Sequence, residues 1–263
     1  MHTHPRPDME WIFLGTGTSH GVPMIGCDCA VCRSDDPRDR RNRAAAAVRL
    51  ADGRVILIDA PPELRLAAVA AGLDRVDAIL LTHAHADHIM GLDDVRRFND
   101  LLGATIPVYG SAPTLRTVRS AFGYAEVAHE RAPANRPSLR LEVIGGATDI
   151  CGRRVRAVPL MHGPTEVLGY RIGATAYCTD CSAIPAASMA LLEGLELLVL
   201  DALRHRPHAS HFTVAEALEA IAALRPRRAL LTHVTHELAH AATSATLPEN
   251  VAIAYDLLRV KSS

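Results

Sequence analysis

Short runs of apolar residues, separated by polar and glycine-containing segments, divide the chain into predicted strands and helices. Trp11–Leu14 predicts a first strand, and a glycine-rich loop follows it. Ala44–Leu50 and Arg54–Asp59 predict two strands joined by a turn at Asp52-Gly53, because Asp-Gly favours tight hairpin turns. Further strands are predicted over Val76–Leu81, Ile106–Tyr109, Leu139–Ile144, Arg154–Leu160, Leu168–Ile172, Thr175–Thr179, Leu195–Leu200, Arg228–Thr232 and near Val251–Tyr255. Helices are predicted over Glu63–Ala71, Leu92–Asn99, Pro113–Phe122, 186–193 and Val214–Leu224.

The last third of the chain alternates helices and strands regularly, which is typical of an α/β protein. Thr213 and Glu216 predict a capping box at the start of the helix over Val214–Leu224. Prolines interrupt Ala125–Pro137, so this segment is expected to be a loop. The sequence has no internal repeat or linker, and we expect a single domain over residues 1–263, with residues 1–9 as a flexible N-terminus.

Composition narrows the class of protein without naming a function. The chain has 263 residues, of which 49% are apolar and 22% charged, with a formal net charge of −1. This balance is typical of a globular protein and argues against a broad basic surface for nucleic acid or membrane. The apolar runs all fall short of the roughly 18 residues that span a bilayer. Six cysteines in a chain of this length do not predict a disulfide scaffold, so a reducing, cytoplasmic location is expected.

The segment Thr82–His88 (THAHADH) carries the clearest chemical signal. It follows the strand predicted over Val76–Leu81 and places three histidines and one aspartate within six residues. These side chains cannot all face one way on a strand or a helix, but they can converge in a loop that leaves a strand. Imidazole nitrogens and a carboxylate are ligands that suit zinc, manganese or iron.

Three further residues of ligand type follow predicted strands downstream. His162 comes after the strand ending at Leu160, Asp180 after Thr179, and His233 after Thr232. Each would therefore lie at the end of an element, where functional sites are usually built. With the Thr82–His88 segment they predict a metal site.

The HxHxDH pattern and the later His, Asp and His in that order resemble the metallo-β-lactamase superfamily, over nearly the whole chain from Leu14 to Tyr255. The resemblance implies an αββα sandwich, in which two mixed β-sheets are flanked by helices. Asp59 matches an aspartate that orients a ligand rather than binding metal. The implied ligands are His83, His85 and His162 for one metal and Asp87, His88 and His233 for the other, with Asp180 bridging.

Two metals roughly 3.5–4 Å apart suit the hydrolysis of a phosphodiester. The expected reaction is attack by a metal-activated hydroxide on a small cyclic or nucleotide-like phosphodiester, in line with the leaving oxygen. Zinc, manganese and iron all remain open as the catalytic metal, since histidine and carboxylate ligands accept each of them.

A second group of ligand type lies in the glycine-rich loop. Cys27, Cys29 and Cys32 form a CxCxxC pattern, and tetrahedral zinc needs a fourth ligand, for which His236 is the candidate. The combination resembles the branch of the superfamily that contains the cyclic-phosphate phosphodiesterases of the carbon–phosphorus lyase pathway. In that branch the Cys₃His zinc is structural, which implies a third, structural zinc here. Cys178 and Cys181, which flank Asp180, are expected to be core residues.

The segment from Leu203 to His211 is the source of the predicted proton donor. By the same resemblance His211 is the candidate general acid for the leaving group, with His208 as its alternative. Arg204 and Arg206 are candidates for binding a substrate phosphate. His20 is a candidate pocket residue, and His240 is expected to be solvated.

Two other functions stay open at this stage. One is a tRNA 3′-processing-type endoribonuclease, although the near-neutral charge and the lack of a Gly/Lys-rich insertion disfavour an RNA partner. The other is a binding or carrier protein like the pyrroloquinoline-quinone biosynthesis B protein, which shares the cysteine pattern but departs from the complete ligand set. A small phosphodiester is thus the expected partner, a membrane is not, and a homodimer is suggested by analogy alone.

Overall fold

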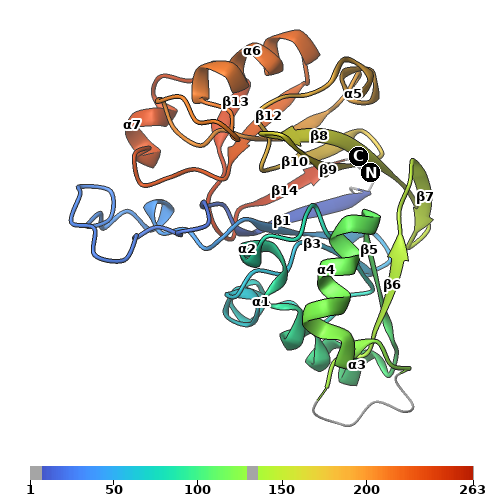
Figure 1. Cartoon of the computed structure of the whole chain (residues 1–263). Helices are drawn as coiled ribbons and strands as arrows, with labels where there is room; N and C mark the ends of the chain where they lie inside the picture. The colour runs from blue at the N-terminus through green and yellow to red at the C-terminus, as the bar shows by residue number, and fades with distance from the viewer. Residues whose placement is uncertain (1–7, 129–135, 263) are drawn as a thin grey trace, which may run out of the picture.

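The computed structural model of the chain describes residues 8–128 and 136–262. Within these residues two seven-stranded mixed sheets face each other, and helices cover the outer side of each sheet (Figure 1). The predicted αββα sandwich is confirmed. No helix in the described part of the chain combines the length and apolarity that crossing a bilayer requires.

The first sheet contains the N-terminal half of the chain and one strand from the C-terminus. Its strands are antiparallel to their neighbours from β14 to β3 and parallel from β3 to β6. In spatial order they are β14 (Arg259–Ser262), β1 (Met9–Gly15), β2 (Ala45–Leu50), β3 (Val55–Ile58), β4 (Ala78–Leu80), β5 (Ile106–Gly110) and β6 (Leu139–Val143).

The second sheet is built from the C-terminal half of the chain. Its neighbouring strands are parallel from β13 to β10 and antiparallel from β10 to β7. In spatial order they are β13 (Val251–Ile253), β12 (Arg228–Thr232), β11 (Leu197–Asp201), β10 (Thr175–Cys178), β9 (Thr165–Ile172), β8 (Arg153–His162) and β7 (Ala147–Ile150).

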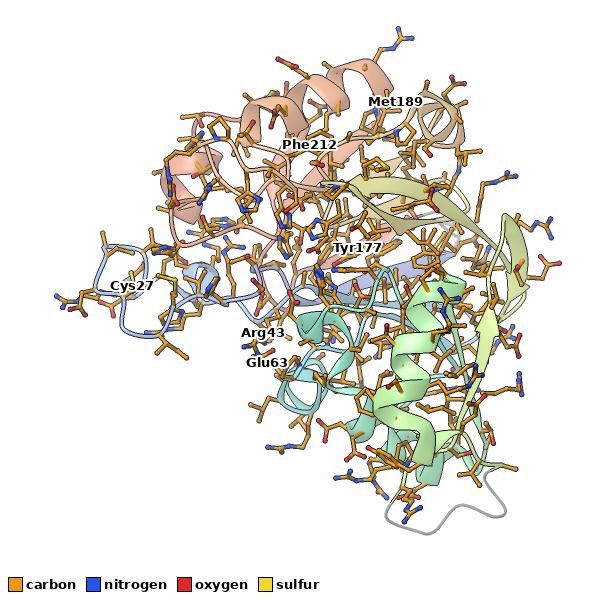
Figure 2. The ribbon with its side chains drawn as sticks, viewed as in Figure 1. Cys27, Arg43, Glu63, Tyr177, Met189 and Phe212 are labelled. Carbon is orange, nitrogen blue, oxygen red and sulfur yellow. The ribbon has the colours of Figure 1, made fainter. Side chains whose placement is uncertain are left out.

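The inner faces of the two sheets bury the largest side chains of the protein. Trp11 and Tyr177 are fully buried, and their rings stack across the interface with centroids 6.2 Å apart. Figure 2 shows Tyr177 in this layer between the sheets. The indole N–H of Trp11 donates to Thr175 Oγ1 at 3.2 Å, so its polar atom is satisfied inside the apolar layer.

Helices bury the outer faces of the sheets in two further apolar layers. Thr213 and Glu216 form the predicted capping box at the start of α6. On the first sheet lie α1 (Leu64–Ala71), α2 (Ala86–Ile89), α3 (Arg96–Leu102) and α4 (Ala112–Phe122), and on the second α5 (Ala186–Leu191) and α6 (Val214–Leu224), with α7 (His240–Ser244) beside β13 (Figure 1). Three short 3₁₀ turns are described at η1 (Pro37–Asp39), η2 (Leu92–Val95) and η3 (Gly123–Ala125).

Several local predictions need correction. β7 and β14 were not predicted, because both are four-residue edge strands that lack a sustained apolar alternation. The short helices α2 and α7 were not predicted either. The helix expected over Leu92–Asn99 begins as the 3₁₀ turn η2 and becomes α-helical at Arg96.

Two predicted flexible segments are described only in part. Of the expected N-terminal tail, residues 1–7 lie outside the described residues, whereas Met9 already pairs with Leu50 and Ser262 in β1. Of the expected loop over Ala125–Pro137, residues 129–135 lie outside the described residues.

Candidate metal centre

The C-terminal ends of strands from both sheets bring the seven predicted metal ligands together at one edge of the sandwich. The residues of the THAHADH segment follow β4, while the later ligands end β8 or follow β10 and β12. In each of two sets, the ligand atoms all lie within 4.8 Å of one another. One set is His83, His85 and His162, and the other is Asp87, His88, Asp180 and His233.

Asp180 belongs to the second set and also faces the first. Its Oδ1 is 3.2 Å from His233 Nε2 and 4.0 Å from His83 Nε2. Its Oδ2 is 3.2 Å from His88 Nε2. One carboxylate therefore faces ligands of both sets, which is the placement that a bridging ligand requires.

Unusual backbone conformations aim several of these side chains. Asp59, Asp180 and His233 have φ values of 62°, 53° and 60°, in the left-handed region that residues other than glycine rarely adopt. Each follows the end of a strand, so the backbone turns there and directs the side chain toward the sheet edge. Strain of this kind is retained where the surrounding structure enforces it, and it is concentrated at functional sites.

Asp59 orients two histidines without lying in either ligand set. Its carboxylate accepts hydrogen bonds from the backbone N–H and the hydroxyl of Thr82, both at 2.8 Å, and from His88 Nδ1 at 2.7 Å. Because the Thr82 hydroxyl donates to Asp59, its oxygen is left to accept from His83 Nδ1 at 3.0 Å. Both imidazoles are thus held with Nε2 directed at the cluster.

Glycine at position 91 lets the THAHADH segment pack against the chain that carries Asp59. The N–H of Gly91 donates to the carbonyl of Ala60 at 2.7 Å. A Cβ at this position would lie 2.1 Å from the carbonyl oxygen of Pro61. Any larger residue would therefore push the ligand segment away from Asp59.

The donor atoms present fit divalent metals. His88 donates through Nδ1, so its buried Nε2 directs a lone pair at Asp180 and at Asp87, whose carboxylate oxygens lie 3.2 and 3.3 Å away. Neither ring nitrogen of His233 has a hydrogen-bond partner among the described residues, and burial lowers the pKa of His233 to about 4. Lone pairs and carboxylates that converge in a buried space need a cation between them.

His211 lies beside both ligand sets and is held by a buried carboxylate. Its Nδ1 donates to Asp201 Oδ2 at 2.8 Å, and its ring centroid is 4.7 Å from that of His162 and 4.8 Å from that of His233. Burial disfavours the charged imidazole, but Asp201 outweighs this effect and raises the pKa of His211.

Sequence reasoning missed Asp201. This residue ends β11 and is fully buried. An aspartate directly after the apolar run Leu197–Leu200 is the signal that could have marked it.

Of the other predicted residues of the Leu203–His211 segment, His208 and Arg206 are exposed and Arg204 is half-buried. His208 is exposed, and its ring centroid is 5.0 Å from that of His211, so it lies at the rim of the site. Arg204 and Arg206 both pair with Glu237, at 3.5 and 2.6 Å. His20 is exposed in the loop after β1 and belongs to neither ligand set.

The predicted cysteine cluster also comes together. Figure 2 shows Cys27 on the loop that extends from the body of the protein. Its Sγ and that of Cys29 are each 3.2 Å from His236 Nδ1, and the ligand atoms of these residues and Cys32 lie within 4.8 Å of one another. The backbone N–H of Cys32 is the main reason why the pKa of Cys29 is lowered to about 6. Three thiols and an imidazole match the donor set of a tetrahedral zinc site.

Two predictions about residues outside these clusters have different outcomes. Cys178 and Cys181 are fully buried, which confirms them as core residues. The expectation that His240 is solvated is wrong, since only 6% of it is exposed. Its ring lies against the buried Arg41, and its backbone N–H donates to Asp39 at 2.7 Å, because the segment around η1 packs over the start of α7.

Comparison with known proteins decides the family. Residues 54–234 match the family model described as the β-lactamase superfamily domain. The chain belongs to the metallo-β-lactamase superfamily. It is similar to the crystal structure of a diphosphatase from the PhnP family, with 41% sequence identity and a TM-score of 0.90 over 97% of this chain and 98% of that one. Zinc-bound PqqB from Methylobacterium extorquens aligns with a TM-score of 0.77 over 96% of this chain and 99% of that one, but its 18% identity shows the shared fold alone.

Curated relatives are matched over part of their length. An octanoyltransferase of Porphyromonas gingivalis is 36% identical over 252 residues, which are 94% of this chain and 50% of that protein. A ribonuclease Z of a Mycobacterium species is 31% identical over 181 residues, which are 59% of this chain and 63% of that protein. The chain spans about half to two thirds of these relatives, so their names carry no activity over to it. Family and ligand sets together make this chain a metal-binding hydrolase of the metallo-β-lactamase fold.

Proposed function

We propose that the protein is a dinuclear metal-dependent phosphodiesterase that hydrolyses a small cyclic or nucleotide-like phosphodiester. The observation that carries this proposal is that Asp180 faces ligands of both sets, with His211 beside both. Zinc, manganese and iron all suit the two sets, and the Cys₃His cluster suits a structural zinc.

The roles of the residues follow from their contacts. The two ligand sets would hold divalent metals, whose chemistry when bound would be to lower the pKa of a water and to neutralise charge on the phosphoryl oxygens. Asp180 would hold the two sets at a fixed separation, and Asp59 keeps His88 oriented. Because Asp201 engages Nδ1 of His211, the Nε2 of that ring remains to donate a proton to the leaving oxygen.

The leaving group distinguishes two substrate classes. A ribose alkoxide is a poor leaving group and needs a proton, which His211 is placed to supply. The similar PhnP-family structure is that of a diphosphatase, and this favours a diphosphate bond as the second candidate. A phosphate leaving group has a second pKa near 6, so it departs with little help from a proton donor.

The test is a panel of phosphodiesters and diphosphates assayed with protein loaded with Mn²⁺ or Zn²⁺. The panel contains cyclic ribose phosphates, bis(p-nitrophenyl) phosphate and a dinucleoside diphosphate. We expect turnover of at least one diester, its loss in Asp87→Ala, and retained turnover in Asp94→Ala, which changes an acid outside both ligand sets. A fully metal-loaded protein that hydrolyses no phosphodiester would contradict the proposal.

Two inexpensive measurements address the rival functions. An endoribonuclease should retard tRNA in a gel at moderate salt, and with a net charge of −1 we expect no shift. A carrier protein should bind about one metal per chain, whereas we expect about three. The homodimer and the cytoplasmic location stay predictions, which size measurement and fractionation of cells would test.

A further inference from the structure

Residues 204–210 form a loop at the rim of the metal centre. The loop leaves the second sheet after Leu203, whose N–H donates to the carbonyl of Phe212 at 2.9 Å, and this contact closes its base. It carries the exposed His208 close to His211. The carbonyl of Ser210, at its other end, accepts a hydrogen bond from Nδ1 of the ligand His162 at 2.8 Å. This rim loop therefore borders the metal centre at His162 and His211.

Glu237 attaches the exposed part of the rim loop to the rest of the protein. Its carboxylate accepts two hydrogen bonds from Arg206, from Nε at 3.0 Å and from an Nη at 2.6 Å, and also pairs with Arg204 at 3.5 Å. Arg204 in turn donates to the carbonyls of Arg206 and Pro207, both at 3.3 Å. One carboxylate thus holds two arginines, and through them the backbone of the loop.

Glu237 directly follows a member of the cysteine cluster in the chain. Glu237 follows His236, whose Nδ1 lies among the thiols and whose carbonyl lies 3.8 Å from Cys29 Sγ. The N–H of Glu237 donates to Thr235 Oγ1 at 3.2 Å, and the backbone N–H of Thr235 donates to the carbonyl of Leu203 at 2.9 Å. A single short segment therefore contacts the cysteine cluster, the base of the rim loop and its exposed part.

We propose that Glu237 is a positioning residue that makes the order of the rim loop depend on the cysteine cluster, and that Arg206 is an anchor of this loop rather than a ligand of the substrate. The effect falls on substrate binding rather than on the chemical step. Asp201 holds His211, and Ser210, which holds His162, lies beside the closed base of the loop and outside the residues 204–207 that the two arginines hold. The kinetic part of this inference rests on the proposed function, whereas the structural part does not.

The first test compares Glu237→Gln with the matched control Glu126→Gln, in the metal-loaded full chain. Glu126 accepts the same two-bond fork, from Arg119 at 2.6 and 2.7 Å, but lies beyond α4. Exposed ion pairs are weak, so we expect Glu237→Gln to raise KM about twofold to fivefold with little change in kcat. Hydrogen exchange at 204–210 should speed up in this variant and stay unchanged in the control. Unchanged exchange in Glu237→Gln would overturn the proposal.

A double-mutant cycle separates an anchor from a substrate ligand. If Arg206 acts through Glu237, Arg206→Ala alone should match Glu237→Gln, and the double variant should be no worse than either single one. If Arg206 touches the substrate, Arg206→Ala should raise KM further in the Glu237→Gln background, which would refute its role as an anchor.

A second cycle tests the dependence on the cysteine cluster. Cys29→Ser should speed up exchange at 204–210 in the otherwise unchanged protein and add nothing in the Glu237→Gln background. If the rate of hydrogen exchange at 204–210 is the same with and without Cys29→Ser, the cysteine cluster does not control the rim loop. Hydrogen exchange can be measured without turnover. A protein that hydrolyses no phosphodiester would therefore contradict the proposed function, and the exchange measurements would still test this inference.

Discussion

The two clusters of metal-ligand type are built in opposite ways. The metal centre is assembled from strand ends of both sheets, so its ligands are placed by backbone that the fold already fixes. The cysteine cluster takes three of its four ligands from one extended loop, and Cys27 and Cys29 remain partly exposed. We therefore expect the first cluster to be prebuilt for its metals and the second to need a metal to hold its loop in place.

Hydrogen bonds to the ligands reveal the same contrast. Around the metal centre, His88 is held by Asp59, His83 by Thr82 and His162 by the carbonyl of Ser210. In the cysteine cluster, His236 Nδ1 contacts the thiols themselves, and the sulfurs of Cys29 and Cys32 accept hydrogen bonds from backbone N–H groups of their own loop. Loss of metal should leave the geometry of the first site largely intact and should loosen the second.

The largest effect should follow from changing the carboxylate shared by both ligand sets. Asp180→Asn keeps the shape of the side chain but removes the charge that faces His88 and His233. We expect turnover to fall to the uncatalysed rate and at least one metal to be lost, as measured by kinetics and metal analysis. The exposed Asp149→Asn serves as the control. A variant with full metal content and turnover within tenfold of the unchanged protein would rule out a bridging role.

The next effect should depend on the leaving group. His211→Ala should lower kcat about 100- to 10,000-fold for a diester that releases an alkoxide, because the proton donor is gone. It should change little for bis(p-nitrophenyl) phosphate, whose leaving group departs readily without a proton. The ratio of the two rates is the measurement. An equal loss for both substrates would mean that His211 supports the site structurally and is not the acid.

Loss of the residue that orients a metal ligand should weaken metal binding less than loss of the ligand itself. In Asp59→Asn, the amide cannot accept all three hydrogen bonds that the carboxylate now accepts from Thr82 and His88. We expect the affinity for metal to fall about 10- to 100-fold, as measured by metal titration. Asp77→Asn is a suitable control, since Asp77 accepts a backbone N–H from Val55 far from the ligands. Unaltered affinity in Asp59→Asn would show that the fold alone aligns His88.

Much of the metal centre could be predicted because each ligand has an unusual chemical type at the end of an apolar run. His162, Asp180 and His233 stand where buried strands end, and parallel strands bring such ends to one edge. Asp201 occupies the same kind of position, but it escaped notice because its partner His211 becomes a neighbour only through the folded loop.

The residues at the rim were harder to interpret. Arg204 and Arg206 look like phosphate ligands in the sequence, and yet both pair with Glu237, which lies about thirty positions further along the chain. No local pattern connects residues so far apart. Likewise, His240 is buried by the segment around Asp39, and the pattern of apolar and polar residues does not predict a contact between these two distant segments.

The smallest effect on turnover should come from the cysteine cluster, and it would sharpen the contrast between the two sites. Cys29→Ser removes a thiol whose pKa is lowered to about 6, chiefly by the backbone N–H of Cys32, and which is therefore ready to bind zinc as a thiolate. We expect one metal fewer per chain, a melting temperature lower by a few degrees, and kcat within a few-fold of the unchanged protein.

Cys151→Ser provides the control, because this half-buried cysteine lies outside the cluster. If the cluster instead contributed directly to catalysis, kcat would collapse in Cys29→Ser while the two remaining metals stayed bound. The metal centre is expected to be ordered without its metals. If the cysteine cluster were ordered in the same way, Cys29→Ser would change neither the melting temperature nor hydrogen exchange in the loop of the cluster. Either result would remove the distinction between a site that the fold builds and a site that its metal builds.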